Sequence, residues 1–148
     1  MESTKFVNIL IVEDNPADAR LIIEVFDGFT IKNKVNIVEN GVEALDYLYK
    51  RDKYKDVKTP SLIILDLNLP KKDGREVLKE IKQNKELRLI PVVVLTTSRD
   101  ENDICGAYMN YANAYLTKPT DFNEFIDLIN TFESFWFNKA VLPQCKKD

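Results

Sequence analysis

The chain has 148 residues, 45% of them hydrophobic and 30% charged, with a formal net charge of −3 and no histidine. This length suits one domain. Without histidine there can be no Ser-His-Asp triad, no histidine general base and no imidazole metal ligand, so any chemistry falls to carboxylates, hydroxyls and lysine. The mildly acidic balance gives no attraction to nucleic acid or to an anionic membrane surface.

Five short apolar blocks recur along the chain, and each is followed by a stretch with helical periodicity. Most blocks are rich in β-branched residues, and nearly continuous apolar runs are typical of parallel strands covered on both faces. The blocks are residues 6–12, 35–38, 62–65, 92–95 and 114–116. Strand and helix therefore alternate, which predicts an α/β fold with a doubly wound (βα)5 parallel sheet and helices on both sides.

The first helix has a clear start signal. Asn15 before Pro16 predicts an N-cap with proline at the first helical position. Apolar residues then follow helical spacing at Ala19, Ile22 and Phe26. The polar stretch 51–59 is expected to be the loop between the second helix and the third strand.

The fourth and fifth helices also carry capping signals. Ser98 with Glu101 predicts a capping box for the fourth helix, and Asp121 with Glu124 predicts a similar arrangement for the fifth. The apolar face expected of the fifth helix consists of Phe122, Phe125, Ile126, Ile129, Phe132 and Trp136.

The cysteines and the apolar runs bear on where the chain acts. Cys105 and Cys145 are expected to be unpaired thiols in a reducing, cytoplasmic compartment, because the sequence carries no secretory signal. The longest apolar runs are about one strand long, far short of the ~18 residues needed to cross a membrane.

Polar side chains follow four of the five predicted strands: Glu13 and Asp14 after the first, Asp66 after the third, Thr96 at the fourth and Lys118 after the fifth. Ligands of open α/β sheets bind beyond the carboxyl ends of the strands. Each residue alone could be a turn, a cap, a strand residue or a surface charge. Together, three carboxylates on neighbouring strand ends would repel one another unless a cation lies between them.

Oxygen ligands without imidazole or thiolate favour Mg²⁺ over zinc. Lys118 adds a positive charge that suits a phosphoryl group, and Thr96 adds a hydrogen-bond donor. This combination is typical of phosphoryl transfer to a carboxylate. Asp66 is the natural nucleophile, because it leaves the middle strand between the other groups.

Four segments, residues 9–15, 65–74, 91–96 and 115–119, make the chain resemble the receiver domain of two-component response regulators. The likeness covers about residues 6–133, with 134–148 as a C-terminal extension of a single receiver domain. It implies a flavodoxin-like sheet with strand order 2-1-3-4-5. It also implies a signalling phosphoacceptor rather than an enzyme, which receives phosphate from the phosphohistidine of a sensor histidine kinase. With no histidine of its own, this chain can supply only the aspartate side of that exchange.

The resemblance assigns roles to the site residues. Asp66 would accept the phosphoryl group; Asp14 and Asp66 would bind Mg²⁺ directly, together with the backbone carbonyl of Asn68, while Glu13 would act through water. Glu13 replaces the aspartate that is commonest in the family at this position.

The remaining assignments concern the phosphate and the switch. Lys118 would pair with the phosphate, Thr96 would reorient to bond a phosphate oxygen, and Tyr115 would turn inward behind it. The Lys118–Pro119 peptide bond would be cis. A closer likeness, carried by residues 67–78 and the tail 135–143, is to phytochrome-associated regulators, which suggests a phytochrome-like kinase as the partner.

Aromatic residues crowd the end of the fifth helix. Phe132, Phe135, Trp136 and Phe137 cannot all face one side of a helix, although Phe132 is expected in the core. The tail either folds back on its own domain or joins the face of helix 4, strand 5 and helix 5 in a homodimer or partner surface.

Other functions of this architecture fit less well. A flavin-binding flavodoxin needs a hydroxyl- and glycine-rich loop after the first strand, where this chain has the acidic stretch 13–18. An aspartate-nucleophile phosphatase would want a general acid at the position of Asn68. A receiver-like binding module that is never phosphorylated remains an alternative, although every group needed for phosphorylation is present.

Overall fold

A computed structural model describes residues 6–28 and 32–143, in which five strands alternate with five helices. The strands are β1 (Phe6–Val12), β2 (Lys32–Val38), β3 (Leu62–Leu65), β4 (Val92–Thr96) and β5 (Ala114–Thr117). The helices are α1 (Pro16–Asp27), α2 (Gly41–Leu48), α3 (Gly74–Gln83), α4 (Glu101–Met109) and α5 (Phe122–Glu133). Short helical turns add η1 (Asp52–Tyr54), η2 (Leu87–Leu89) and the π-helical η3 (Ser134–Lys139). In this part of the chain, no helix is long and apolar enough to cross a membrane.

The strands form one parallel sheet in the order β2-β1-β3-β4-β5, which confirms the predicted fold. The chain passes from β1 to β2, returns across β1 to β3, and then continues to β5. Strand order therefore reverses between β1 and β3, which pair in register as far as Val12 and Leu65. The crevice outside the carboxyl ends of strands at such a reversal is where open α/β sheets bind their ligands.

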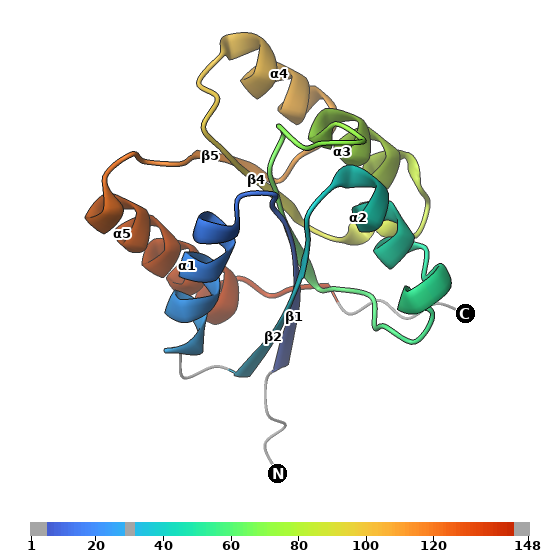
Figure 1. The fold of residues 1–148 in the computed structure, drawn as a ribbon, viewed down its shortest axis with the longest axis horizontal. Helices are drawn as coiled ribbons and strands as arrows, with labels where there is room; N and C mark the ends of the chain where they lie inside the picture. Colours follow the sequence, from blue (N-terminus) through green and yellow to red (C-terminus); the bar gives the residue numbers. More distant parts are fainter. Residues whose placement is uncertain (1–5, 29–31, 144–148) are drawn as a thin grey trace.

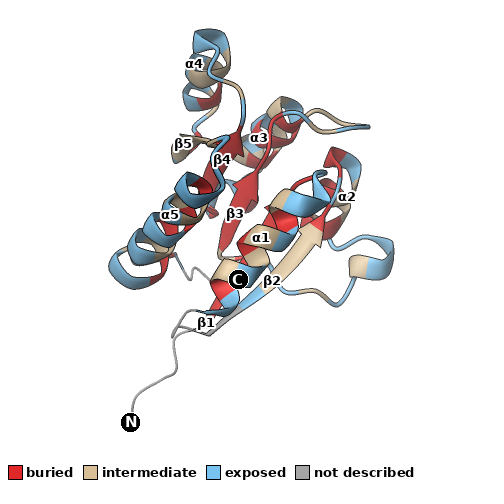
Figure 2. Cartoon of the chain, turned by 60° about the vertical axis from the view of Figure 1, so that its left-hand side comes forward, coloured by how far each residue is buried: buried red, intermediate tan, exposed pale blue. Residues whose placement is uncertain are grey.

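Two apolar clusters cover the two faces of the sheet. Helices α1 and α5 lie on one face and α2, α3 and α4 on the other (Figure 1). Strands β3 and β4 are buried along their whole length, whereas the outer faces of the helices are exposed (Figure 2). Each aliphatic side chain buried in this way contributes about 1.5–3 kcal/mol to folding. The sheet is therefore a rigid base for whatever lies at its carboxyl edge.

Two of the predicted helix starts are confirmed. The side chain of Asn15 accepts hydrogen bonds from the backbone N–H groups of Ala17 and Asp18, with Pro16 at the start of α1. The carboxylate of Asp121 accepts from the N–H of Glu124 at the start of α5.

The predicted cap of α4 is wrong. The helix begins at Glu101, and its N-cap is Asp100, whose Oδ1 accepts from the N–H of Asn102 at 2.7 Å. The Ser98 hydroxyl instead donates to the carboxylate of Asp103 at 2.5 Å. The reason is that Asp100 is itself a strong capping residue and lies closer to the helix, which frees Ser98 for another partner.

The apolar face of α5 is narrower than predicted. Phe125, Ile129 and Phe132 are buried, as expected, and Ile126 is half-buried. Phe122 is 62% exposed, so it does not belong to the buried face of the helix on which it was predicted. It is the first residue of the helix, and α5 packs on the rest of the protein only from Phe125 onward.

The segment after α5 packs partly on its own domain. Phe137 is completely buried in the apolar cluster of α1 and α5, and Leu142 joins the same cluster. Phe135 and Val141 stay 53% and 94% exposed. The tail thus folds back as far as Leu142 while still presenting apolar side chains outward. Cys105 is an exposed free thiol, and Cys145 lies outside the described residues.

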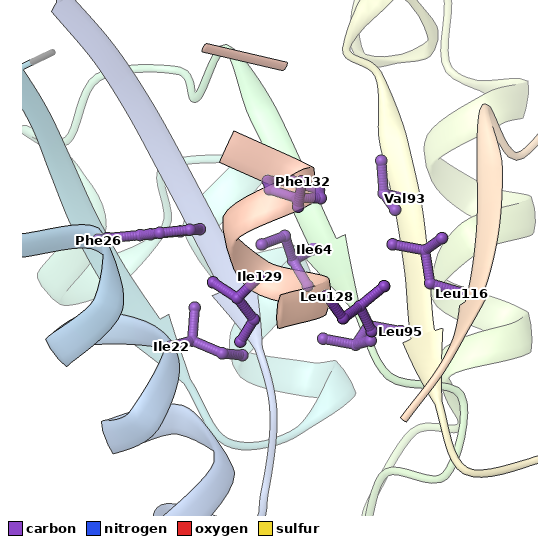
Figure 3. A pocket seen from close by; sticks show the side chains of 9 residues that line it. All are labelled: Ile22, Phe26, Ile64, Val93, Leu95, Leu116, Leu128, Ile129 and Phe132. Atoms are coloured by element: carbon purple, nitrogen blue, oxygen red, sulfur yellow. The ribbon is translucent and has the colours of Figure 1, made fainter. Parts of the chain in front are cut away.

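A small apolar void lies between α1, α5 and the sheet (Figure 3). Its volume is about 10 Å³, which is at the lower limit for one water molecule, and its walls offer no polar group to hold one. It is lined by Ile22, Phe26, Ile64, Val93, Leu95, Leu116, Leu128, Ile129 and Phe132. It is therefore a packing feature of the core rather than a binding site.

Candidate functional site

The ends of β1, β3 and β5 bring two carboxylates and a lysine together inside the protein. Glu13, Asp66 and Lys118 are only 3%, 6% and 6% exposed. Their positions follow from the sheet, because the N–H of Asp66 donates to the carbonyl of Val12 and that of Lys118 to the carbonyl of Thr96. Buried charges are costly unless they are paired, so the lysine and the two carboxylates at these strand ends pair with one another.

Lys118 is the centre of the cluster. Its ammonium lies 2.5 Å from Glu13 Oε1, 3.1 Å from Asp66 Oδ2 and 2.9 Å from Asp18 Oδ2. Three carboxylates share one positive charge, which leaves an excess of negative charge at the site. The arrangement therefore favours a further cation.

The shared lysine shows in the pKa values of the cluster. Burial lowers the pKa of Lys118, but the hydrogen bond and charge of Glu13 and the charge of Asp66 outweigh it, so the pKa lies above its ordinary value. Burial raises the pKa of Glu13 to about 7, against the opposing effect of Lys118. The single positive charge of Lys118 cannot stabilise the ionised form of every carboxylate around it, and Glu13 is the carboxylate whose pKa rises as a result.

The acidic residues form a candidate site for a divalent cation. Carboxylate oxygens of Glu13, Asp14 and Asp66 all lie within 4.8 Å of one another. Asp14 is exposed while the other two are buried, so the cluster is reached from solvent. Oxygen ligands of this kind suit a hard divalent cation, and its charge would offset the excess negative charge. The residues present thus fit the metal that was expected here.

Thr96 is the polar group that the fold leaves unsatisfied. It is completely buried at the end of β4, and its Oγ1 has no hydrogen-bond partner among the described residues. Such a group costs about 1–3 kcal/mol. A hydroxyl kept in this state beside a cluster of charged groups is suited to a ligand that brings its own acceptor.

Tyr115 lies half-buried on β5, and its ring packs against the apolar cluster of α2, α3 and α4. Its hydroxyl donates to the carbonyl of Ser98 at 3.0 Å, and its N–H donates to the hydroxyl of Tyr108 at 3.1 Å. The side chain is therefore tied to the segment between β4 and α4, two residues beyond Thr96.

The loop from β3 to α3 is folded tightly around Asp66. The N–H of Asn68 donates to Asp66 Oδ1 at 3.2 Å, and the Asn68 side chain is exposed. A Cβ on Gly74 would lie 2.2 Å from the carbonyl oxygen of Asp66, so only glycine fits there. The start of α3 is thus held directly against the carboxylate-bearing end of β3.

Sequence reasoning missed one residue of the cluster. Asp18 lies on the first turn of α1 and reaches Lys118 across the end of the sheet. No spacing rule pointed to this contact, because Asp14 lies before the N-cap of α1 and only Asp18 belongs to the helix.

One expectation about the backbone was wrong. No peptide bond in the described part of the chain is cis, so Lys118–Pro119 is trans. Trans is the favoured isomer of X–Pro bonds by about 0.5–1 kcal/mol, and Lys118 reaches its three carboxylates with it.

Comparison with known proteins gives a family for this geometry. The profile of the response regulator receiver domain matches residues 9–130. The response regulator Rcp1 of Synechocystis sp. is 47% identical over 135 residues, which are 91% of this chain and 92% of Rcp1. The crystal structure of Rcp1 in its Mn²⁺-bound form superimposes with a TM-score of 0.91, covering 93% of this chain and 99% of that one.

Two further relatives agree. The phosphorylated cyanobacterial phytochrome response regulator RcpA is 45% identical, with a TM-score of 0.92, covering 95% of this chain and all of the other. A probable methanogenesis regulatory protein, FilR2 of Methanothrix harundinacea, is 41% identical over 91% of this chain and 88% of its own. The chain therefore belongs to the response regulator receiver family, as a phosphoacceptor of two-component signalling.

Proposed function

We propose that Asp66 is the residue that accepts the phosphoryl group. A carboxylate oxygen of Asp66 attacks the phosphorus of a phosphohistidine, an O–P bond forms and the N–P bond of the donor breaks. The electron pair of the broken bond stays on the donor imidazole, which takes up a proton. The observation that carries this assignment is the buried carboxylate of Asp66 at 3.1 Å from Lys118, beside the acidic pair Glu13 and Asp14.

Neighbouring residues provide for the charge that the phosphoryl group brings. Lys118 can turn from Asp66 to a phosphate oxygen, because its other two carboxylate partners keep its ammonium at the site. The unpartnered hydroxyl of Thr96 can donate to a second oxygen. Binding of the phosphoryl group would thus satisfy a donor that the unphosphorylated protein leaves without a partner.

We assign the metal site to Mg²⁺. Asp14 and Asp66 would hold it with the backbone carbonyl of Asn68, and Glu13 would act through water. The bound ion would offset negative charge on the carboxylates and on the transferring oxygens. An all-oxygen donor set supports this assignment, since it is the type that Mg²⁺ prefers.

The names of the relatives suggest the partner. Because RcpA is a phytochrome response regulator, we propose that a phytochrome-like sensor histidine kinase donates the phosphate to this chain in the cytoplasm. The chain would act as one receiver domain, with residues 134–148 as an extension. It would turn over no external substrate and bind no nucleic acid or membrane.

The exposed apolar residues support an output surface. We propose that the face of α4, β5 and α5, with the tail, forms a homodimer. Tyr108, Met109 and Tyr111, at and just after the end of α4, are 49%, 77% and 74% exposed, and Phe122 at the start of α5 and Phe135 in η3 are 62% and 53% exposed. Sedimentation with and without a phosphoryl mimic tests this proposal, and a monomer under both conditions would contradict it.

Two alternatives are less well supported. A phosphatase would need a general acid in place of Asn68, whose amide cannot give up and regain a proton. A module that is never phosphorylated would have no use for the unpartnered Thr96 hydroxyl.

The proposal is tested by incubating the protein with acetyl phosphate and Mg²⁺ and measuring its intact mass. We expect the wild type to gain one phosphoryl group, and the Asp66→Asn variant or a sample with excess chelator to gain none. An Asp127→Asn variant, altered at an exposed position of α5, serves as the matched control and should behave as the wild type. Phosphorylation of Asp66→Asn would overturn the assignment.

A further inference from the structure

Helix α4 is held on the protein in an unusual way. Ala107 is the only one of its residues that is buried. A cavity of about 120 Å³ lies between it and α3, lined by Leu67, Leu78 and Arg75 on the α3 side and mostly by polar residues of α4 and Gly106 on the other. Apolar packing therefore fixes α4 only weakly, and polar contacts must supply the rest.

Those contacts converge on Asp103. The guanidinium of Arg75, on α3, reaches across to Asp103 Oδ1 with Nε at 2.9 Å and Nη2 at 2.8 Å. The other oxygen of the carboxylate, Oδ2, accepts from the Ser98 hydroxyl at 2.5 Å. These hydrogen bonds from Ser98 and Arg75 lower the pKa of Asp103 below its ordinary value, so the carboxylate is charged at neutral pH.

Arg75 is itself fixed in place. Its Nη1 binds both carboxylate oxygens of Asp73, at 3.0 and 3.2 Å, and its backbone N–H is capped by the same side chain. The preceding residue, Gly74, abuts the carbonyl of Asp66. The guanidinium thus extends from a backbone that is packed against the end of β3.

The far end of this chain of contacts is the segment between β4 and α4. The Ser98 hydroxyl donates to Asp103, and the Ser98 carbonyl accepts from the Tyr115 hydroxyl at 3.0 Å. One residue therefore joins the carboxylate of α4 to the half-buried tyrosine of β5. We name Arg75, Asp103 and Ser98 the α3–α4 clamp.

We infer that the α3–α4 clamp holds the β4–α4 segment in the arrangement that receives the phosphoryl group, and that Asp103 is a positioning residue for the site. It fixes Ser98, and Ser98 fixes the hydroxyl of Tyr115; both contacts are made by Ser98, two residues beyond Thr96 in the chain. The inference rests on the proposed function, because it concerns how the same site is organised. Asp103 itself touches neither Asp66 nor the metal cluster in the structure.

The test is calorimetric titration with beryllofluoride, a phosphoryl mimic, in the presence of Mg²⁺. We expect Asp103→Asn to bind it at least about fivefold more weakly than the wild type, a coupling at the low end for linked sites. Glu101→Gln is the matched control, because it removes the other carboxylate of the first turn of α4, for which no ion pair exists among the described residues. Its affinity should stay within about twofold of the wild type.

The outcomes separate the two hypotheses. If the wild type does not bind the mimic, the proposed function fails. If the wild type binds it and Asp103→Asn binds equally well or more tightly, the proposed function stands and the clamp inference is overturned.

Variants at Ser98 distinguish positioning from a general effect on folding. Ser98→Ala should weaken binding of the mimic as Asp103→Asn does, whereas Ser98→Thr keeps the hydroxyl and should restore it. The double variant Ser98→Ala/Asp103→Asn should lose no more than the larger of the two single losses, because both substitutions act on the site through the same Ser98–Asp103 contact. Equal behaviour of Ser98→Ala and Ser98→Thr, or additive losses in the double variant, would contradict the clamp.

Discussion

Helices α5 and α4 cover the same sheet in opposite ways. α5 buries Phe125, Ile129 and Phe132 against α1 and the sheet, and the ring of Phe132 stacks on that of Phe26 at 6.0 Å. α4 buries only Ala107 and is tied by side-chain hydrogen bonds and an ion pair. Apolar packing is stiff and insensitive to charge, whereas polar contacts are directional and respond to a change of charge nearby. We therefore expect a phosphoryl group to affect the α4 side of the molecule more than the α5 side.

The same contrast separates the core from the carboxyl edge of the sheet. Below the edge, the strands are filled with valine, isoleucine and leucine. At the edge, Lys118 lies among three carboxylates and Thr96 lacks a partner. We therefore expect the apolar core to supply most of the stability and the carboxyl edge to respond to added charge. The variants below should affect these two regions differently.

The largest effect is expected from a cavity on the α5 side. Phe132→Ala should lower the free energy of unfolding by about 3–5 kcal/mol, because it removes a buried aromatic side chain that neighbours cannot replace. Urea denaturation measures this loss. Phe122→Ala, on the same helix but 62% exposed, should cost less than about 1 kcal/mol. Similar losses for the two variants would contradict the packing described for α5.

The substitution Lys118→Met removes the positive charge at the carboxyl edge of the sheet. In the absence of divalent cations, this substitution leaves the carboxylates of Glu13 and Asp66 buried with no counter-charge. We expect the free energy of unfolding, measured by urea denaturation at pH 8, to fall by about 3–4 kcal/mol. Added Mg²⁺ should recover part of the loss, because it supplies positive charge to the same carboxylates. Mg²⁺ should raise the free energy of unfolding of Phe132→Ala by no more than it raises that of the wild type. A larger increase for Phe132→Ala would contradict the distinction between the two regions.

The pH dependence of the metal-free protein sharpens the comparison at Glu13. Burial raises its pKa from 4.5 to about 7, so between these values the folded state binds more protons than the unfolded state. The stabilisation is complete below pH 4.5 and is lost as the pH rises through 7. One pKa unit corresponds to about 1.4 kcal/mol, so we expect a total fall of about 3 kcal/mol from below pH 4.5 to above pH 7. Denaturation of Glu13→Gln in a chelator should lack this slope, and an unchanged slope would contradict the raised pKa.

The smallest effect concerns the start of α4. Asp100→Ala removes the N-cap and should cost about 1 kcal/mol, while Asp100→Ser keeps an acceptor and should cost less. Hydrogen exchange should show the loss of protection in the first turn of α4 and little change in α5. A uniform loss over both helices would mean that α4 is not the weakly held element.

Most of the architecture could be predicted because the relevant signals are local. Continuous apolar runs and the caps at Asn15 and Asp121 require no knowledge of the rest of the chain. The errors occur where tertiary contacts decide. Ser98 has the sequence signature of a cap, but Asp103 captures its hydroxyl, and Phe122 fits the apolar stripe of α5 but lies beyond the surface that α5 covers.

The site was predictable for a related reason. Glu13, Asp14, Asp66, Thr96 and Lys118 all lie at or just after the carboxyl end of a strand, so the order of strands in a parallel sheet brings them together. Asp18 and Arg75 reach their partners from helices, and sequence spacing does not reveal the distance between the ends of two side chains. Contacts such as Lys118 with Asp18, or Arg75 with Asp103, required the structure.

The most direct test of phosphoacceptance is to locate the acyl phosphate. The protein is phosphorylated with acetyl phosphate and Mg²⁺, reduced with borohydride, which converts an aspartyl phosphate to homoserine, and digested for peptide mass spectrometry. Homoserine at position 66, with Asp14 and Asp18 unmodified, is the predicted result. Homoserine at position 14 or 18, or none in a protein that has gained a phosphoryl group, would contradict Asp66 as the acceptor.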